Sequence, residues 1–322
     1  MVTTQAKNIR IIYMGTPDFA VEPLKLLVEN GYNVVAVVTV PDKPAGRGQK
    51  LQQSAVKIYA QTVNLPVLQP YKLKDEKFLN AVCNYDAELF IVVAFRMLPE
   101  IVWQIPPLGT FNLHASLLPQ YRGAAPINHA IINGETITGV TTFFINNEID
   151  AGKIIFSEKV EIKHSDNAGT LHDKLMKTGA ALVLKTVDSI ACNNIDLQQQ
   201  SENKNLKPAP KIFKETCKIK WDRTPEEIYN FIRGLSPYPA AWCEFTGSDK
   251  QTVSAKIYSA AYDNTEHNLP FGTLKSDGKT FLKIACNGGF INILDIHLAG
   301  KKRLPVREFL AGFRDMENYL IK

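Results

Sequence analysis

Short apolar runs alternate with amphipathic segments through the first two thirds of the chain. The runs are rich in β-branched residues and too short for helices, so they are predicted as strands; they cover residues 8–14, 33–40, 66–68, 87–93, 111–113, 139–144 and 154–162. Helical spacing of apolar positions predicts helices at residues 18–30, 54–62, 75–84, 125–132 and 170–190. Strands that alternate with helices predict a mostly parallel sheet covered by helices on both faces.

The pattern changes after residue 197. Residues 198–210 are polar, with three consecutive glutamines and two prolines, and they are predicted to form a linker. Beyond it, one helix is expected at 225–233 and short strands at 242–245, 253–260, 272–274, 280–285 and 290–297. Short strands separated by turns predict a small β-barrel. We therefore expect a domain over 1–197, a linker over 198–210 and a second domain over 211–322.

Composition fits a globular protein. The 322 residues are 45% hydrophobic and 21% charged, and no apolar stretch approaches a membrane span. No export signal precedes the first apolar run, so a cytoplasmic protein without a membrane partner is expected. The five cysteines are an odd number without a Cys-x-x-Cys pair, which indicates free thiols in a reducing compartment. His164, His172, His267 and His297 are interpreted as lacking acidic or Cys neighbours at ligand spacing, so no metal is expected.

Charge is distributed unevenly between the two parts. The net charge is +5; residues 208–322 hold 17 Lys and Arg against 13 Asp and Glu, and residues 1–207 hold 20 against 19. The excess in the final third permits contact with a polyanion without requiring it.

Residues 41–50 interrupt all periodicity. They contain two prolines, two glycines and three cations, Lys43, Arg47 and Lys50. The composition predicts a mobile loop. Such a loop can be an ordinary solvated surface segment, or its spaced cations can grip the phosphates of a nucleic acid.

The candidate chemistry is concentrated in the motif that begins at the strand 111–113. Asn112 and His114 are two residues apart at the end of a strand, so their side chains share one face near the rim of the sheet. An amide donor beside a titratable imidazole suits acyl transfer, in which a tetrahedral oxyanion must be stabilised. Ser116 lacks the Gly-x-Ser-x-Gly surroundings of an activated nucleophile, so direct attack by an amine is expected. Asp150 is the candidate acid that orients His114 or takes the proton of the amine.

The combined motifs resemble the formyltetrahydrofolate-dependent formyltransferase superfamily. The resemblance is carried by the sequence Asn-x-His-x-Ser-Leu-Leu-Pro-x-Tyr-Arg-Gly-x-x-Pro from Asn112 to Pro126, with Asp-Ala-Gly at 150–152. It continues through residues 14–20, 41–48, 235–242 and 299–302 and so spans nearly the whole chain. It implies a Rossmann-like domain followed by an OB-like β-barrel. It also implies transfer of a formyl group from 10-formyltetrahydrofolate to the amino group of methionine on initiator tRNA.

The resemblance also implies roles for individual residues. Asn112 would hold the formyl oxygen, and His114, kept charged by Asp150, would stabilise the oxyanion. The folate would lie against Ser116, Leu117, Leu118 and Pro119 and the turn of Phe95, Arg96, Met97 and Leu98. The tRNA would contact Lys43, Arg47 and Lys50 and the barrel cations Lys301, Lys302 and Arg303; these barrel cations can equally form a solvated rim.

The chain departs from the family pattern at two of these positions. Lys43 stands where Arg is frequent and lacks the planar fork of a guanidinium. Arg96 stands where many relatives have glycine. Two alternative functions are weighed against formylation of tRNA: a folate-dependent N-formyltransferase that acts on an amino sugar nucleotide, and a non-catalytic RNA-binding relative.

Overall fold

A computed structural model of the protein describes residues 4–45, 50–201, 205–247, 251–313 and 319–321. Its contacts divide the chain into two compact units. The first contains residues 1–123, 137–161 and 172–208, and the second contains residues 124–136, 162–171 and 209–322. The sequence predicted two domains that are each continuous, with boundaries at 197 and 211. Each of these units instead combines segments that are separate in sequence, so the predicted boundaries stay predictions.

The first unit is built on a seven-stranded sheet in the described part of the chain, with the order β5-β2-β1-β6-β7-β8-β9. Five strands pair in parallel: β5 (Val67–Leu68), β2 (Val34–Val38), β1 (Ile11–Gly15), β6 (Leu89–Val93) and β7 (Thr110–His114). β8 (Ile137–Phe144) and β9 (Ile154–Glu161) continue the sheet antiparallel. Every residue of β1 and β6 is buried, as expected for strands with both faces covered.

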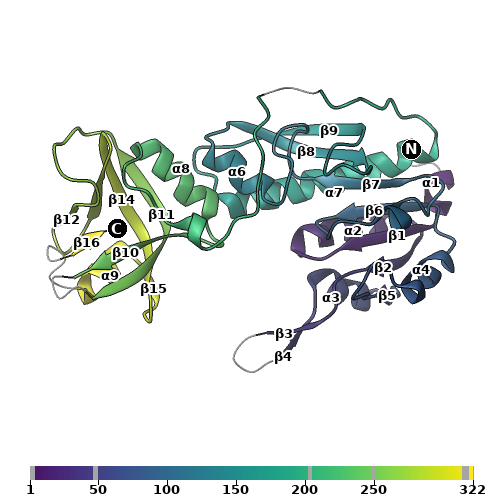
Figure 1. The fold of residues 1–322 in the computed structure, drawn as a ribbon, viewed down its shortest axis with the longest axis horizontal. Coiled ribbons are helices and arrows are strands. Elements are labelled where there is room, and N and C mark those ends of the chain that lie inside the picture. Colours follow the sequence, from purple (N-terminus) through teal and green to yellow (C-terminus); the bar gives the residue numbers. More distant parts are fainter. Residues whose placement is uncertain (1–3, 46–49, 202–204, 248–250, 314–318, 322) are drawn as a thin grey trace. The chain divides into compact units, whose positions relative to one another are not determined.

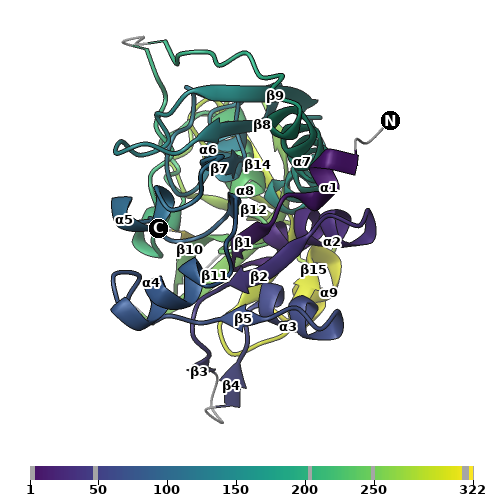
Figure 2. The same cartoon turned by 90° about the vertical axis from the view of Figure 1, so that its right-hand side faces the viewer.

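Helices cover both faces of this sheet (Figure 2). α4 (Glu76–Cys83) and α5 (Glu100–Trp103) share a core with the alternate residues Met14 and Val92. α2 (Val21–Glu29) and α7 (Ala168–Ala191) lie on the other face. α7 packs closely there, because a Cβ at Gly179 would lie 2.8 Å from a methyl group of Leu113. The remaining helices of this part are α1 (Thr4–Asn8), η1 (Asp18–Ala20) and α3 (Ala55–Thr62).

The carboxyl ends of the parallel strands form one rim of the sheet. The chain continues from β1 to β2 on one side, whereas β6 lies on the other side, so the strand order reverses between β1 and β6. Open α/β sheets bind ligands at such a switch point. The rim carries the turn at 94–98 and the motif that follows β7. It also carries the hairpin of β3 (Lys43–Ala45) and β4 (Lys50–Gln52), which extends away from the sheet (Figure 1).

The second unit contains an antiparallel sheet that forms a nearly closed barrel (Figure 1). Its strands are β12 (Leu274–Ser276), β13 (Leu282–Cys286), β14 (Gly289–Leu298), β11 (Thr252–Asp263), β10 (Ala241–Thr246) and β16 (Leu320–Ile321), with β15 (Arg303–Pro305) on β14. The pairing of β11 with β14 shifts around Ser259, and such irregularities increase strand curvature. The helices are α6 (Pro126–Ile132), η2 (Glu215–Cys217), α8 (Pro225–Leu235) and α9 (Val306–Gly312).

The predicted fold class is confirmed, and local corrections are few. The strand predicted from residue 8 begins at Ile11, because residues 4–8 form α1. The prediction of a loop without regular structure over residues 41–50 is wrong at its ends, where β3 and β4 pair. The barrel strand predicted at 272–274 begins at Leu274 instead. Helix α7, predicted from residue 170, begins at Ala168, because the Asn167 Oδ1 caps it by accepting the Thr170 N–H at 2.9 Å.

Candidate active site

Asn112 and His114 lie on the face of β7 that points away from α7. Leu113 between them contacts α7, and strand side chains alternate between faces. Asn112 pairs in register with Val92 of β6 and Phe143 of β8, and its side chain is half-buried. His114 ends the strand and is 7% exposed. The strand therefore presents an amide and an imidazole side by side at the rim.

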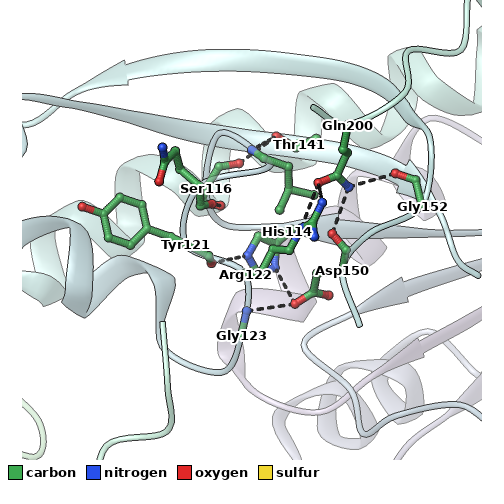
Figure 3. Close-up of polar contacts among 11 residues, drawn as sticks. His114, Ser116, Tyr121, Arg122, Gly123, Thr141, Asp150, Gly152 and Gln200 are labelled. Carbon is green, nitrogen blue, oxygen red and sulfur yellow. Dashed lines mark hydrogen bonds and ion pairs between the residues drawn. The ribbon is translucent and has the colours of Figure 1, made fainter. Parts of the chain in front are cut away.

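Two contacts fix the His114 ring (Figure 3). Its Nε2 is 2.9 Å from the Tyr121 carbonyl oxygen. A carbonyl oxygen only accepts hydrogen bonds, so Nε2 carries a hydrogen and donates it. Nδ1 faces the carboxylate of Asp150, with 3.9 Å between Nδ1 and Oδ2. The imidazole is thus held with one nitrogen on the backbone and the other toward an acid.

Asp150 is held in a conformation that a non-glycine residue seldom adopts. Its φ is +52°, in the left-handed region. Its Oδ2 accepts the Gly123 N–H at 3.0 Å. Gly152 must be a glycine, because a Cβ there would lie 1.7 Å from the Phe144 carbonyl oxygen. The Asp-Ala-Gly sequence therefore combines a carboxylate aimed at His114 with a close approach of the backbone to β8.

Gln200 is a buried residue of this site that the sequence did not reveal. It lies in the polar stretch predicted as a linker, yet it is 5% exposed. Its Nε2 donates to the carbonyl oxygens of Asp150 at 2.9 Å and Gly152 at 2.8 Å. Its Oε1 accepts from Arg122 Nε at 3.0 Å and from the terminal Nη2 at 2.6 Å. Gln200 thereby joins the Asp150 loop to the segment that follows His114 (Figure 3).

In the first segment predicted to lie against the folate, residues 116–119, polar groups form hydrogen bonds with other groups of the protein. Ser116 is fully buried, and its hydroxyl donates to the Gln120 carbonyl oxygen at 2.6 Å. Leu118 is 7% exposed, whereas Leu117 and Pro119 are half-buried. The Thr141 hydroxyl donates to the Ser116 carbonyl oxygen at 2.7 Å and accepts the Leu118 N–H at 3.2 Å. The Ser116 side chain therefore has a structural partner, and the backbone of this turn is fixed.

The second predicted folate segment follows β6. Leu98 is buried in the core beneath the turn, and Phe95 packs against the same core. Met97 is 71% exposed. Arg96 is half-buried and its guanidinium lies 5.4 Å from the centre of the Phe95 ring. It donates to the carbonyl oxygens of Tyr71, at 3.0 Å, and Pro70. Burial lowers the pKa of the Arg96 guanidinium.

The predicted tRNA-contacting cations differ in their surroundings. Lys43 is exposed at the start of β3, and Lys50 begins β4. Arg47 lies outside the described residues. In the barrel, Lys301 and Lys302 are exposed. Arg303 is engaged instead: it forms an ion pair of 2.7 Å with Asp295, and its guanidinium stacks 3.9 Å from the centre of the Tyr258 ring.

The ranges that the structure describes contain no cluster of three or more His, Cys, Asp or Glu side chains that could hold a metal ion. None of the helices built from those residues is both long and apolar enough to span a membrane.

Comparison with known proteins matches both parts of the chain. Residues 7–187 match the family described as formyl transferase, and residues 211–314 match the formyl transferase C-terminal domain. A protein of Bacteroides thetaiotaomicron named methionyl-tRNA formyltransferase is 56% identical over 316 residues, which cover 97% of this chain and 98% of the relative. A protein of Parabacteroides distasonis with the same name is 55% identical over 320 residues, covering 98% of this chain and 99% of the relative.

A solved structure shares the fold at lower identity. It is the sugar 3N-formyl transferase WlaRD, crystallised in the presence of dTDP and 5-N-formyl-THF. It superposes with a TM-score of 0.63 at 22% identity and covers 91% of this chain and 99% of its own. Together with the family matches over 7–187 and 211–314, these likenesses show that the chain belongs to the formyl transferase family.

Proposed function

We propose that the protein transfers a formyl group from 10-formyltetrahydrofolate to the free amino group of methionyl-initiator tRNA, the reaction that supports translation initiation. The observation that carries the proposal is the convergence of His114 and Asp150, 3.9 Å apart, beside Asn112 at the rim of the sheet. It occurs in a chain that is 56% identical, over 97% of its length, to a relative named for this reaction. The proposal includes a cytoplasmic location for the reaction.

The reaction needs charge stabilisation more than a protein nucleophile. The amine of methionine attacks the formyl carbon directly, and the formyl oxygen becomes an oxyanion. The Asn112 amide donates to that oxygen, and His114, which faces the Asp150 carboxylate, stabilises the developing charge. Asp150 takes the proton that the amine loses. The tetrahedral intermediate then collapses, the bond between the formyl carbon and N10 of the folate breaks, and tetrahydrofolate leaves with that proton on N10. Polar groups held rigidly before the reaction act without reorganisation, which is why the fixed His114 ring supports this role.

The two substrates are assigned to different elements of the chain. The backbone of residues 116–119 and the turn at 95–98 hold the folate donor. The cations Lys43, Arg47 and Lys50 of the β3–β4 segment and Lys301 and Lys302 of the barrel contact tRNA phosphates. Arg303 contributes less, because Asp295 already neutralises it. No metal takes part in this scheme.

A formylation assay with charged initiator tRNA tests the proposal. Asn112→Ala and His114→Ala are expected to lower kcat roughly a hundredfold to a thousandfold, the usual effect of removing one oxyanion donor. Both variants should still bind the tRNA. Asn80→Ala is the matched control, since Asn80 is exposed on α4. Loss of tRNA binding with normal turnover of bound substrate would contradict the assigned roles.

The same assay separates the two alternatives. An amino sugar nucleotide offered in place of charged tRNA should not be formylated. Its efficient formylation would move the protein to a different acceptor class. Absence of folate binding by the wild-type chain would instead favour a non-catalytic RNA-binding protein.

A further inference from the structure

The two chain segments that connect the β3–β4 hairpin to the rest of the unit are bonded to each other. Thr39, which follows β2, and Ser54, which precedes α3, approach each other with 2.7 Å between their hydroxyl oxygens. Ser54 also caps α3, where its Oγ accepts the Lys57 N–H at 3.1 Å. Both ends of the segment that carries the hairpin are thus tied to each other and to α3.

A second set of bonds fixes Val40 and Asp42, which lie just before the hairpin. Lys57 Nζ donates to Asp42 Oδ2 at 2.6 Å and to Gln69 Oε1 at 2.8 Å. Gln69 Nε2 donates to Asp42 Oδ1 at 2.7 Å and to the Val40 carbonyl oxygen at 2.8 Å. Hydrogen bonds from Lys57 and then Gln69 lower the pKa of the Asp42 carboxyl. Every donor and acceptor type of the Gln69 amide is used, so its orientation is defined.

The residues next to Gln69 are held from the other side of the rim. Arg96, in the turn after β6, donates to the carbonyl oxygens of both Pro70 and Tyr71. The Tyr71 side chain is 83% exposed, so the guanidinium holds the backbone rather than packing against the ring. Arg96 Nε is buried without a hydrogen-bond partner in the part of the chain that the structure describes. An unpaired buried donor destabilises a fold, so stability alone does not explain an arginine here.

Residues 69–71 therefore connect two elements that the sheet itself keeps apart. The hairpin follows β2 and the turn follows β6, and β1 lies between these strands. We propose that Gln69–Pro70–Tyr71 is a strut that fixes the RNA-facing hairpin and the donor-facing turn relative to each other. Lys57, Gln69 and Arg96 are then positioning residues for the transfer, acting through the hairpin and the turn. This inference rests on the proposed function.

The strut predicts that damage at either end affects both substrates. Steady-state kinetics are measured with charged initiator tRNA and with 10-formyltetrahydrofolate varied in turn. Gln69→Leu removes the bonds to Val40, Asp42 and Lys57; it should raise the KM for tRNA about tenfold and that for the folate about threefold. Arg96→Met should give the reverse ratio. Both variants break the same connection, so the increase in KM for the double variant should be smaller than the product of the increases for the two single variants.

Controls separate positioning from folding. Gln104→Leu makes the same chemical change at an exposed glutamine that directly follows α5 and should alter neither KM. Arg96→Lys and Gln69→Asn keep polar groups and serve if the apolar variants do not fold. Arg96→Lys should raise the KM for the folate less than Arg96→Met does, because an ammonium group can still reach one carbonyl oxygen.

Two results would overturn the inference while leaving the proposed function intact. In the first, folded Gln69→Leu changes only the KM for tRNA and folded Arg96→Met changes only the KM for the folate, while the effect of the double variant equals the two single effects multiplied together. In the second, none of these variants changes either KM. Failure of the wild-type chain to formylate charged tRNA would instead overturn the proposed function.

Discussion

At the scale of single residues, the site depends on how His114 and Asp150 are held rather than on their presence alone. His114 Nε2 donates a hydrogen bond to the Tyr121 carbonyl oxygen, so rotation of the ring would break that bond. Asp150 has a positive φ, a strained conformation that persists only where the surroundings impose it. The Gly123 N–H and the Gln200 amide supply those constraints. In the proposed reaction, Gln200 is accordingly a positioning residue for Asp150.

Replacement of Gln200 should therefore impair turnover more than substrate binding. Gln200→Leu leaves the carbonyl oxygens of Asp150 and Gly152 and the Arg122 guanidinium without this partner. We expect kcat to fall about tenfold or more, with a smaller change in KM. The free energy of unfolding should drop by about 1–3 kcal/mol for buried groups left unpaired. Urea denaturation and steady-state kinetics measure the two effects, and exposed Gln199→Leu is the control. Unchanged kcat in Gln200→Leu would show that Asp150 needs no such support.

At the scale of elements, the sequence predicted what periodicity can encode. The strands β1, β2, β6 and β7 were predictable because they are short apolar runs. Asn112, His114 and Asp150 were singled out from residue type, spacing and family resemblance, and the structure places His114 beside Asp150. Their roles stay predictions.

Other features were not predictable because local pattern does not carry them. The pairing of β3 with β4 involves three residues in each strand, too few for a period to be visible. Burial of Gln200 depends on carbonyl groups fifty and forty-eight residues away, and a polar run gives no sign of them. The hydrogen bonds of Arg96 were not predictable either, because its partners lie in the segment between β5 and α4.

Helix α8 offers a prediction that belongs to one element. Thr224 Oγ1 accepts the Glu227 N–H at 3.3 Å, and Glu227 Oε2 accepts the Thr224 N–H at 2.9 Å, which is a capping box. Thr224→Ala should lower the free energy of unfolding by about 1 kcal/mol. Thr224→Ser keeps the oxygen and should stay near wild type. Chemical denaturation of the full chain measures both, and equal stability of the two variants would exclude a contribution from the cap.

At the scale of the whole molecule, acid stability should reflect carboxylates with depressed pKa values. Hydrogen bonding from Lys283 and then Thr265 lowers the pKa of Asp263 to about 2. The unfolded pKa of an aspartate is about 3.9, so the stabilisation is present above about pH 4 and is lost as the pH falls through about 2. Asp263→Asn should therefore cost less than about 1 kcal/mol at pH 7, as for partly exposed ion pairs, and almost nothing near pH 2. Melting temperatures of both proteins across pH 2–7 test this, with exposed Asp196→Asn as the control. A difference that grows on acidification would reverse the sign and contradict it.

Charge over the whole molecule should appear in the salt dependence of the reaction, and the barrel cations should contribute unequally. Each phosphate contact made by a free cation changes the slope of log KM against log salt by about 0.7–0.9. Lys302 is exposed, so Lys302→Met should reduce the slope for charged tRNA by about that amount. Arg303 is already paired with Asp295 and stacked on Tyr258, so the charge-neutral double variant Arg303→Met/Asp295→Asn should leave the slope unchanged. The folate KM provides the internal control, because a small donor releases few counterions. Equal reductions in slope for the Lys302 variant and the double variant would mean that Arg303 leaves Asp295 to meet the RNA, and the assignment of Arg303 to a structural role would then be wrong.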